Sequence, residues 1–181
     1  MRPELDNEAF PEFVRALAFA ARKHSLQRRK DAEASPYINH PIALVSILAV
    51  EAGIDDRATL CAALLHDTLE DTETSTEELI EAFGGEVASL VQEVTDDKRL
   101  PKEERKRLQI EHAEHLSAKA RLVKLADKIA NLRDVADSPP TGWSLERRQE
   151  YFDWAKNVVD NVPNVPPPLQ SLFDAAYERR P

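Results

Sequence analysis

A histidine and three carboxylates follow an apolar run in the segment Cys61–Thr72, CAALLHDTLEDT. In a helix, residues four apart share a face, so Asp67 would lie beside Asp71. By the same spacing His66 would lie beside Glu70. Like charges at this spacing repel, and the repulsion grows where water is scarce. A bound cation would offset it, so the segment predicts part of a metal site.

The remaining ligands must come from elsewhere, because two adjacent residues cannot complete a site. His40, in the sequence NHP, stands at the start of a predicted buried helix, and Asp127 lies inside another, in LVKLAD. A buried carboxylate is costly without a partner. Imidazole nitrogen and carboxylate oxygen suit Zn, Mn or Fe. The predicted ligands come from three helices and leave positions open for substrate and water: His40, His66, Asp67 and Asp127.

Each of these residues also has an ordinary structural interpretation. His40 could be a helix cap or a surface residue, and Asp127 could form an ion pair with Lys128. The acids after His66 could belong to a solvated helix end. The metal site is favoured because all of its parts occur together in one chain.

The elements that must position these residues are predicted to be helices. Only four glycines occur, alternating apolar and polar stretches are nearly absent, and apolar residues recur at helical spacing. Pro41 suits a first helical turn, and Asp55 or Asp56 can cap the helix that carries the HD pair. Thr74 and Ser75 each precede a glutamate by three residues, which is typical of a capping box.

The fold is therefore predicted to be all-α, a single compact bundle of roughly eight or more helices. The bundle is expected to occupy residues 1–160, followed over 161–181 by a proline-rich, extended tail with a short helix packed on the domain. Predicted helices cover 10–24, 41–53, a segment that begins after 55 or 56, a segment from 76 to a break at Gly84-Gly85, 86–95, 101 to about 116, 118–135, 145–159 and 169–177, with a loop over 25–39.

Composition limits the class of protein. With 181 residues, 42% hydrophobic and 31% charged, the chain can form one domain with a real core. The single cysteine, Cys61, lies in an apolar run, which excludes a disulfide framework and indicates a reducing compartment. No apolar run is long enough to span a membrane, and the N-terminal MRPELDNEAF lacks an apolar signal segment. A cytoplasmic protein without a membrane partner is expected.

The distribution of charge favours a small anionic ligand. The net charge of −9 argues against broad nucleic-acid binding, which needs a basic surface. Two basic clusters, at 27–30 (QRRK) and 98–107 (KRLPKEERKR), could instead bind phosphate groups. Either cluster alone could also be a solvated face.

The order H…HD…D is the signature of the HD superfamily of metal-dependent phosphohydrolases, and the surrounding sequence is more specific. The segments AARKHSLQRRKD, PYINHP, AALLHDTLEDT, FGGEVASLVQEVTDDKRLPKEERKR, LVKLADKIANLRD and GWSLERRQEYFDWA resemble the hydrolase domain of the RelA/SpoT family. The resemblance covers roughly residues 13–160. It is greatest to the stand-alone small alarmone hydrolases, which include the metazoan SpoT homologues.

This resemblance implies an Mn²⁺-dependent hydrolase that removes the 3′-diphosphate of ppGpp or pppGpp, giving GDP or GTP and pyrophosphate. It implies the same four metal ligands, and it assigns Glu70 and Asp71 to positioning and activating the attacking water. Tyr151 or Trp154 would line the pocket, although both could equally be core aromatics of an amphipathic helix. The candidate substrate-binding residues are Arg29, Lys30, Lys102, Asn131 and Tyr151.

Two other functions fit the same residues. A phosphatase acting on another nucleotide with a ribose phosphate, such as NADPH, would need the same metal and basic rim. A non-catalytic HD module would bind a nucleotide as a sensor, but it is disfavoured because none of the expected ligands or acids is missing. The chain is too short to hold the synthetase domain of the long bifunctional relatives, so synthesis is not expected, and the tail after residue 160 is not recognisably family-like.

Overall fold

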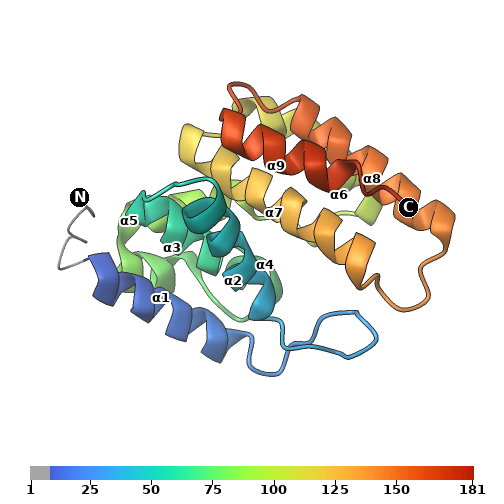
Figure 1. Ribbon diagram of the computed structural model, residues 1–181. Helices are drawn as coiled ribbons and strands as arrows, with labels where there is room; N and C mark the ends of the chain where they lie inside the picture. The colour runs from blue at the N-terminus through green and yellow to red at the C-terminus, as the bar shows by residue number, and fades with distance from the viewer. Residues whose placement is uncertain (1–8) are drawn as a thin grey trace.

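A computed structural model describes residues 9–181, which form a bundle of helices (Figure 1). Residues 1–8, to which part of the prediction about an N-terminal signal segment applies, lie outside the described residues. Between 9 and 181 the only β-type pairing is a single bridge between Arg28 and Pro36, so the all-α prediction is confirmed. The helices are α1 (Ala9–Lys23), α2 (Asn39–Val45), η1 (Ser46–Glu51), α3 (Arg57–Leu65), α4 (Thr68–Asp71), α5 (Thr76–Val94), α6 (Lys102–His112), η2 (Ala113–His115), α7 (Ala118–Asp137), α8 (Leu145–Asp160) and α9 (Pro167–Tyr177).

The predicted helix starts and breaks follow local hydrogen bonding. The Asp56 carboxylate accepts from the backbone N–H of Thr59, and the Ser75 hydroxyl accepts from that of Glu78. Both are N-caps, which supply acceptors for N–H groups that have no partner inside the helix. Gly84 has a φ of 83°, which side chains with a Cβ rarely adopt, and it kinks α5 at the predicted break.

Two helices differ from the prediction. The helix expected over 41–53 begins two residues earlier and changes to a π-helical turn at Ser46–Glu51. The helix expected to continue through the HD pair ends at Leu65, and the four-residue α4 starts afresh at Thr68. Asp67, between them, has φ −99° and ψ 1°, outside the α-helical range. The prediction of one uninterrupted helix through the HD pair is therefore wrong.

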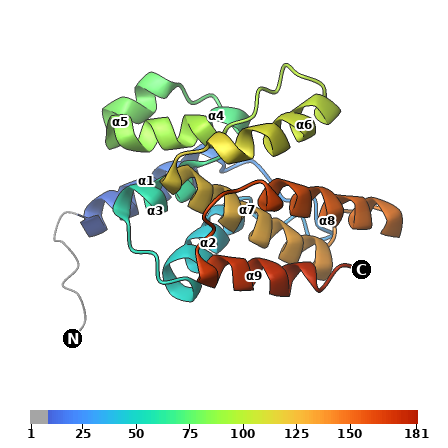
Figure 2. The same ribbon diagram turned by 90° about the horizontal axis from the view of Figure 1, so that it is seen from above.

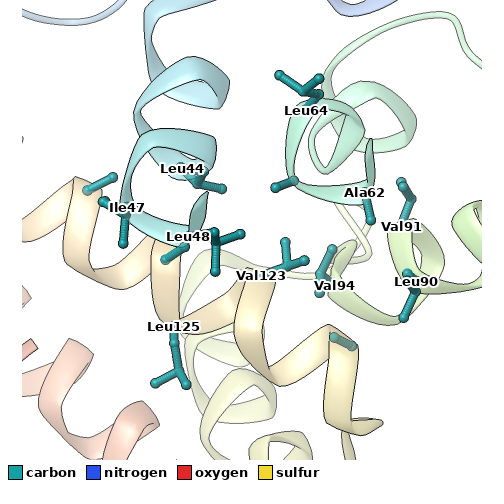
Figure 3. Close-up of a cluster of buried hydrophobic side chains, with 14 of the residues drawn as sticks. Leu44, Ile47, Leu48, Ala62, Leu64, Leu90, Val91, Val94, Val123 and Leu125 are labelled. Carbon is teal, nitrogen blue, oxygen red and sulfur yellow. The ribbon is translucent and has the colours of Figure 1, made fainter. Parts of the chain in front are cut away.

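Helix α7 is the centre of the bundle, because it packs against α2, η1, α3, α5, α8 and α9. Figure 2 shows α5 and α6 on one side of it and α9 on the other. Figure 3 shows how side chains from three elements meet there: Leu48 of η1, Val94 of α5 and Val123 of α7. Both Leu48 and Val123 are fully buried. Asp127 lies one turn beyond Val123, so the core fixes the position of a candidate ligand.

The C-terminal segment is more ordered than an extended tail. Helix α9 begins at Pro167 rather than near 169, and prolines suit the first helical turn because the missing N–H would have no partner there. Leu169 and Phe173 are 0% and 1% exposed and belong to the same buried cluster as the residues of α7. In the described part of the chain no helix is long and apolar enough to cross a membrane.

We expect Phe173→Ala to lower the free energy of unfolding by about 3–5 kcal/mol, because truncating a buried aromatic leaves a cavity. Urea denaturation followed by circular dichroism would measure the loss. Ser171→Ala, an exposed change on the same helix, is the control and should alter stability by less than about 0.5 kcal/mol. An equally small loss for Phe173→Ala would contradict the packing of α9.

Candidate active site

Four side chains from separate elements converge at the sequence-predicted metal site. His40 is the second residue of α2, His66 follows the last residue of α3, Asp67 precedes α4 and Asp127 lies within α7. Ligand atoms of the first three all lie within 4.8 Å of one another. The Asp127 Oδ1 atom lies 3.1 Å from His40 Nε2 and 3.9 Å from His66 Nε2. The structure thus brings together all four predicted ligands.

The helix break at the HD pair aims the two side chains into the site. The His66 Nδ1–H donates to the backbone carbonyl of Ala63 at 2.9 Å, so Nε2 is the nitrogen that faces the carboxylates. The Thr68 hydroxyl donates to the carbonyl of Leu65 at 2.7 Å and so satisfies a carbonyl at the end of α3. The His66 Nε2 atom is buried and has no hydrogen-bond partner, although Asp67 Oδ2 is 3.0 Å away. A buried nitrogen whose lone pair faces carboxylates fits a metal ligand.

The charges of the site attract a cation. Burial disfavours the charged form of His66, but the carboxylates of Asp67 and Asp127 raise its pKa to about 9. Burial opposes ionisation of Asp67 too, yet His66 and His40 hold its pKa below the usual range. The pKa of Asp127 is also lowered, against burial, by Lys128 and the two histidines. Two ionised carboxylates beside two imidazoles match the donors preferred by a divalent first-row ion.

Neighbouring side chains hold the carboxylates in place. The Tyr37 hydroxyl donates to Asp67 Oδ2. The Asn131 amide donates to Asp127 Oδ1 at 2.7 Å, and the Lys128 ammonium donates to Oδ2 at 3.2 Å. Partners of this kind orient ligands and tune their basicity. Asn131 therefore contacts a candidate ligand and also lines the cleft predicted to hold the substrate. The ion pair between Asp127 and Lys128 is present together with the ligand cluster.

Glu70 lies beside the cluster on α4. Burial, followed by the nearby Asp67 and Asp96 carboxylates, raises the pKa of Glu70 to about 7. Its Oε2 accepts from the backbone N–H of Asp96 at 3.2 Å, and the Arg105 guanidinium lies 3.7 Å from Oε1. A carboxyl group with a pKa near neutrality suits proton transfer.

Asp71, at the end of α4, is held from two sides. The Gln27 amide donates to Oδ2 at 2.9 Å, and the Lys98 ammonium donates to Oδ1. Lys98 is half exposed, whereas the Gln27 contact is partly buried. Sequence reasoning missed Gln27, although it belongs to the basic cluster at 27–30.

A cleft of about 700 Å³ opens over the cluster. Trp154 lines this cleft. So do all five predicted substrate-binding residues, which are Arg29, Lys30, Lys102, Asn131 and Tyr151. A second hollow of about 460 Å³ shares some of the same walls, including Arg29 and Tyr151. Arg29 also pairs with Asp134 of α7. Arg133 pairs with Glu51 at 2.7 Å.

A group of neighbouring cations lines the cleft. Burial, then the nearby Arg147 and Lys106, lower the pKa of Lys102, and Lys30 adds to this effect. Mutual repulsion of this kind marks a group of cations that an anion would stabilise. Sequence reasoning did not single out Lys106 or Arg147, although each belongs to a segment that it quoted.

A helical bundle that gathers H, HD and D into one cluster defines the HD-domain class of proteins. The family described as "HD domain" matches residues 16–153. The chain is 56% identical to the guanosine-3′,5′-bis(diphosphate) 3′-pyrophosphohydrolase MESH1 of Xenopus tropicalis, over 91% of this chain and 92% of the relative. It is 54% identical to human MESH1, over 93% and 94%.

A solved structure described as a metazoan ortholog of SpoT that hydrolyses ppGpp superposes with a TM-score of 0.90. It is 52% identical, and the match covers 93% of this chain and 95% of that one. The chain therefore belongs to the HD-domain family and, within it, to the MESH1 family. The HD fold and the His/Asp cluster together indicate a divalent metal site.

Proposed function

We propose that this protein is an Mn²⁺-dependent hydrolase that removes the 3′-diphosphate of ppGpp and pppGpp, releasing pyrophosphate and leaving GDP and GTP. The observation that carries the proposal is the convergence of the four candidate ligands in a cleft that several cations also line. The relatives named for this activity support it, since they match over more than nine tenths of the chain.

In this reaction water attacks the phosphorus atom joined to the ribose 3′-oxygen, the P–O3′ bond breaks, and the 3′-oxygen takes up a proton. His40, His66, Asp67 and Asp127 would hold the ion. When bound, a divalent ion polarises a phosphoryl oxygen and lowers the pKa of water. Glu70, whose pKa of about 7 lies near neutrality, would accept the proton of the attacking water. Asp71 would orient that water.

The substrate carries two diphosphate groups, and the cleft offers cations for the one that does not react. Lys102, Lys106 and Arg147 line the cleft together with Lys30, which belongs to the loop between α1 and α2. Ammonium and guanidinium groups bind phosphate oxygens through charge-assisted hydrogen bonds. Arg29 and Tyr151, which line both hollows, would contact the nucleoside.

The direct test is to incubate purified, Mn²⁺-loaded protein with ppGpp and, separately, with NADPH. We expect pyrophosphate and GDP from ppGpp in equal amounts. Failure to release pyrophosphate would contradict the proposal. Faster release of phosphate from NADPH than of pyrophosphate from ppGpp would instead favour the alternative ribose-phosphate substrate.

We expect Lys102→Gln to raise KM for ppGpp about tenfold or more while changing kcat little, because a charge-assisted contact to phosphate is worth about 1.5–3 kcal/mol. Initial rates across a range of ppGpp concentrations would measure this. Lys156→Gln, which removes an exposed lysine paired with Asp160 on α8, is the matched control. Equal KM values for the two variants would remove Lys102 from the substrate site.

A further inference from the structure

A second buried histidine lies outside the candidate ligand set. His24, only 2% exposed, follows the end of α1, and its Nδ1 lies 2.6 Å from Gln27 Oε1. The other end of the Gln27 amide donates to Asp71 Oδ2 at 2.9 Å. The three side chains thus form a continuous chain of hydrogen bonds from the end of α1 to the site.

The direction of each hydrogen bond in this chain follows from chemistry. An ionised carboxylate only accepts, so the Gln27 NH₂ group must face Asp71. The Gln27 Oε1 atom then faces His24, whose Nδ1 must carry the proton. His24 Nε2 is buried and has no hydrogen-bond partner among the described residues. Each bond in the chain therefore fixes the orientation of the next group.

The backbone and packing hold this chain rigid. The Gln27 N–H donates to the carbonyl of His24 at 3.0 Å, and its own carbonyl accepts from the N–H of Tyr37 at 3.2 Å. The His24 ring packs against the Tyr37 ring, with centroids 4.8 Å apart. Tyr37 in turn donates to Asp67, so one small unit restrains both a candidate ligand and the acid beside it.

Resting on the proposed function, we infer that Gln27, anchored by His24, is a positioning residue that orients the Asp71 carboxylate toward the attacking water. Lys98, the other partner of Asp71, is half exposed on the loop between α5 and α6. The Gln27 contact, on Oδ2, is the more buried of the two. Oδ1 accepts from Lys98, and its second lone pair is the one that can accept from the water. Groups that lock a catalytic side chain in one orientation typically contribute tenfold to a hundredfold.

The test is a double-mutant cycle with Gln27→Leu and Asp71→Asn, measured as kcat for pyrophosphate release by Mn²⁺-loaded protein. We expect Gln27→Leu to lower kcat by about tenfold to a hundredfold, with KM within about threefold of wild type. In the Asp71→Asn background the same change should have no further effect. Metal content, measured separately, should stay at the wild-type ratio, because Gln27 contacts no candidate ligand.

Gln170→Leu is the matched control, since the Gln170 amide also donates to a carboxylate, Asp174, but on α9 away from the site. A Gln27→Leu variant as active as this control, or one that lowers kcat equally with and without Asp71, would overturn the inference. Should Gln27→Leu fail to fold, the second variant is His24→Asn, which keeps the Gln27 amide but removes the imidazole ring that anchors it. It should lower kcat only where Asp71 is intact, and any other result counts against the inference. Absence of pyrophosphate release by wild-type protein would instead contradict the proposed function.

Discussion

Asp67→Ala is expected to remove the divalent ion and to lower kcat for pyrophosphate release by about a thousandfold or more. Asp67 supplies one of only two carboxylates among the four candidate ligands, and it lies 3.0 Å from His66. A catalytic ion contributes several kcal/mol to the transition state, and about 4 kcal/mol corresponds to a thousandfold in rate. The metal-to-protein ratio after dialysis, measured by atomic emission, and the initial rate with saturating ppGpp would both report the loss.

The control for this change is Asp160→Ala, which removes an exposed carboxylate paired with Lys156 on α8. It should leave metal content and rate at wild-type values. Circular dichroism would establish that both variants are folded. Retention of one ion per chain by Asp67→Ala under the same dialysis would show that Asp67 is not a ligand.

Most helices could be predicted because their signals are local. Periodic apolar residues, the caps at Asp56 and Ser75 and the kink at Gly84 each depend on residues within a few positions of one another. Such signals persist in the folded state because the tertiary packing agrees with them. The core around α7 then follows, since the apolar faces of these helices have to be buried.

The break between α3 and α4 could not be predicted in this way. The sequence LLHDTL across the junction contains no glycine or proline, so no residue type that breaks helices marks the end of α3. What stabilises the break is contact at a distance: Asp67 accepts from Tyr37, thirty positions earlier in the chain. A polar junction that opposes local propensity is typical of a functional site. The prediction of a metal site in this segment was drawn from a continuous helix that the structure does not contain.

The candidate ligands could be found from sequence because histidine and aspartate at helix positions near apolar runs are unusual. Their supporting residues could not, because glutamine and lysine are ordinary surface residues unless the fold buries them. Gln109 shows this: its amide donates to Asp96 at 2.5 Å and its carbonyl accepts from Lys128 at 2.8 Å. It thereby links the surroundings of Glu70 to those of Asp127, and no local pattern identifies it.

Asp71→Asn is expected to lower kcat by about a hundredfold to ten thousandfold while leaving the metal content unchanged. The carboxylate lies at the end of α4, and its hydrogen bonds go to Gln27 and Lys98 rather than to the four candidate ligands. Orienting or deprotonating water contributes a factor of this size. Asparagine keeps the shape of the side chain but replaces one acceptor oxygen by an NH₂ group and removes the charge, so it cannot orient the water in the same way. Initial rates and metal content would be measured as for Asp67→Ala.

The comparison of the two variants separates two roles that activity alone confuses. Loss of a ligand removes the ion and the rate together, whereas loss of an acid that acts on water removes the rate only. Addition of excess Mn²⁺ should therefore restore part of the activity of a variant with weakened metal binding, but none of the activity of Asp71→Asn. Asp97→Asn, an exposed change in the nearby loop between α5 and α6, should behave as wild type. Asp71→Asn that lost its metal, or that turned over at the wild-type rate, would contradict the role of this acid in orienting water.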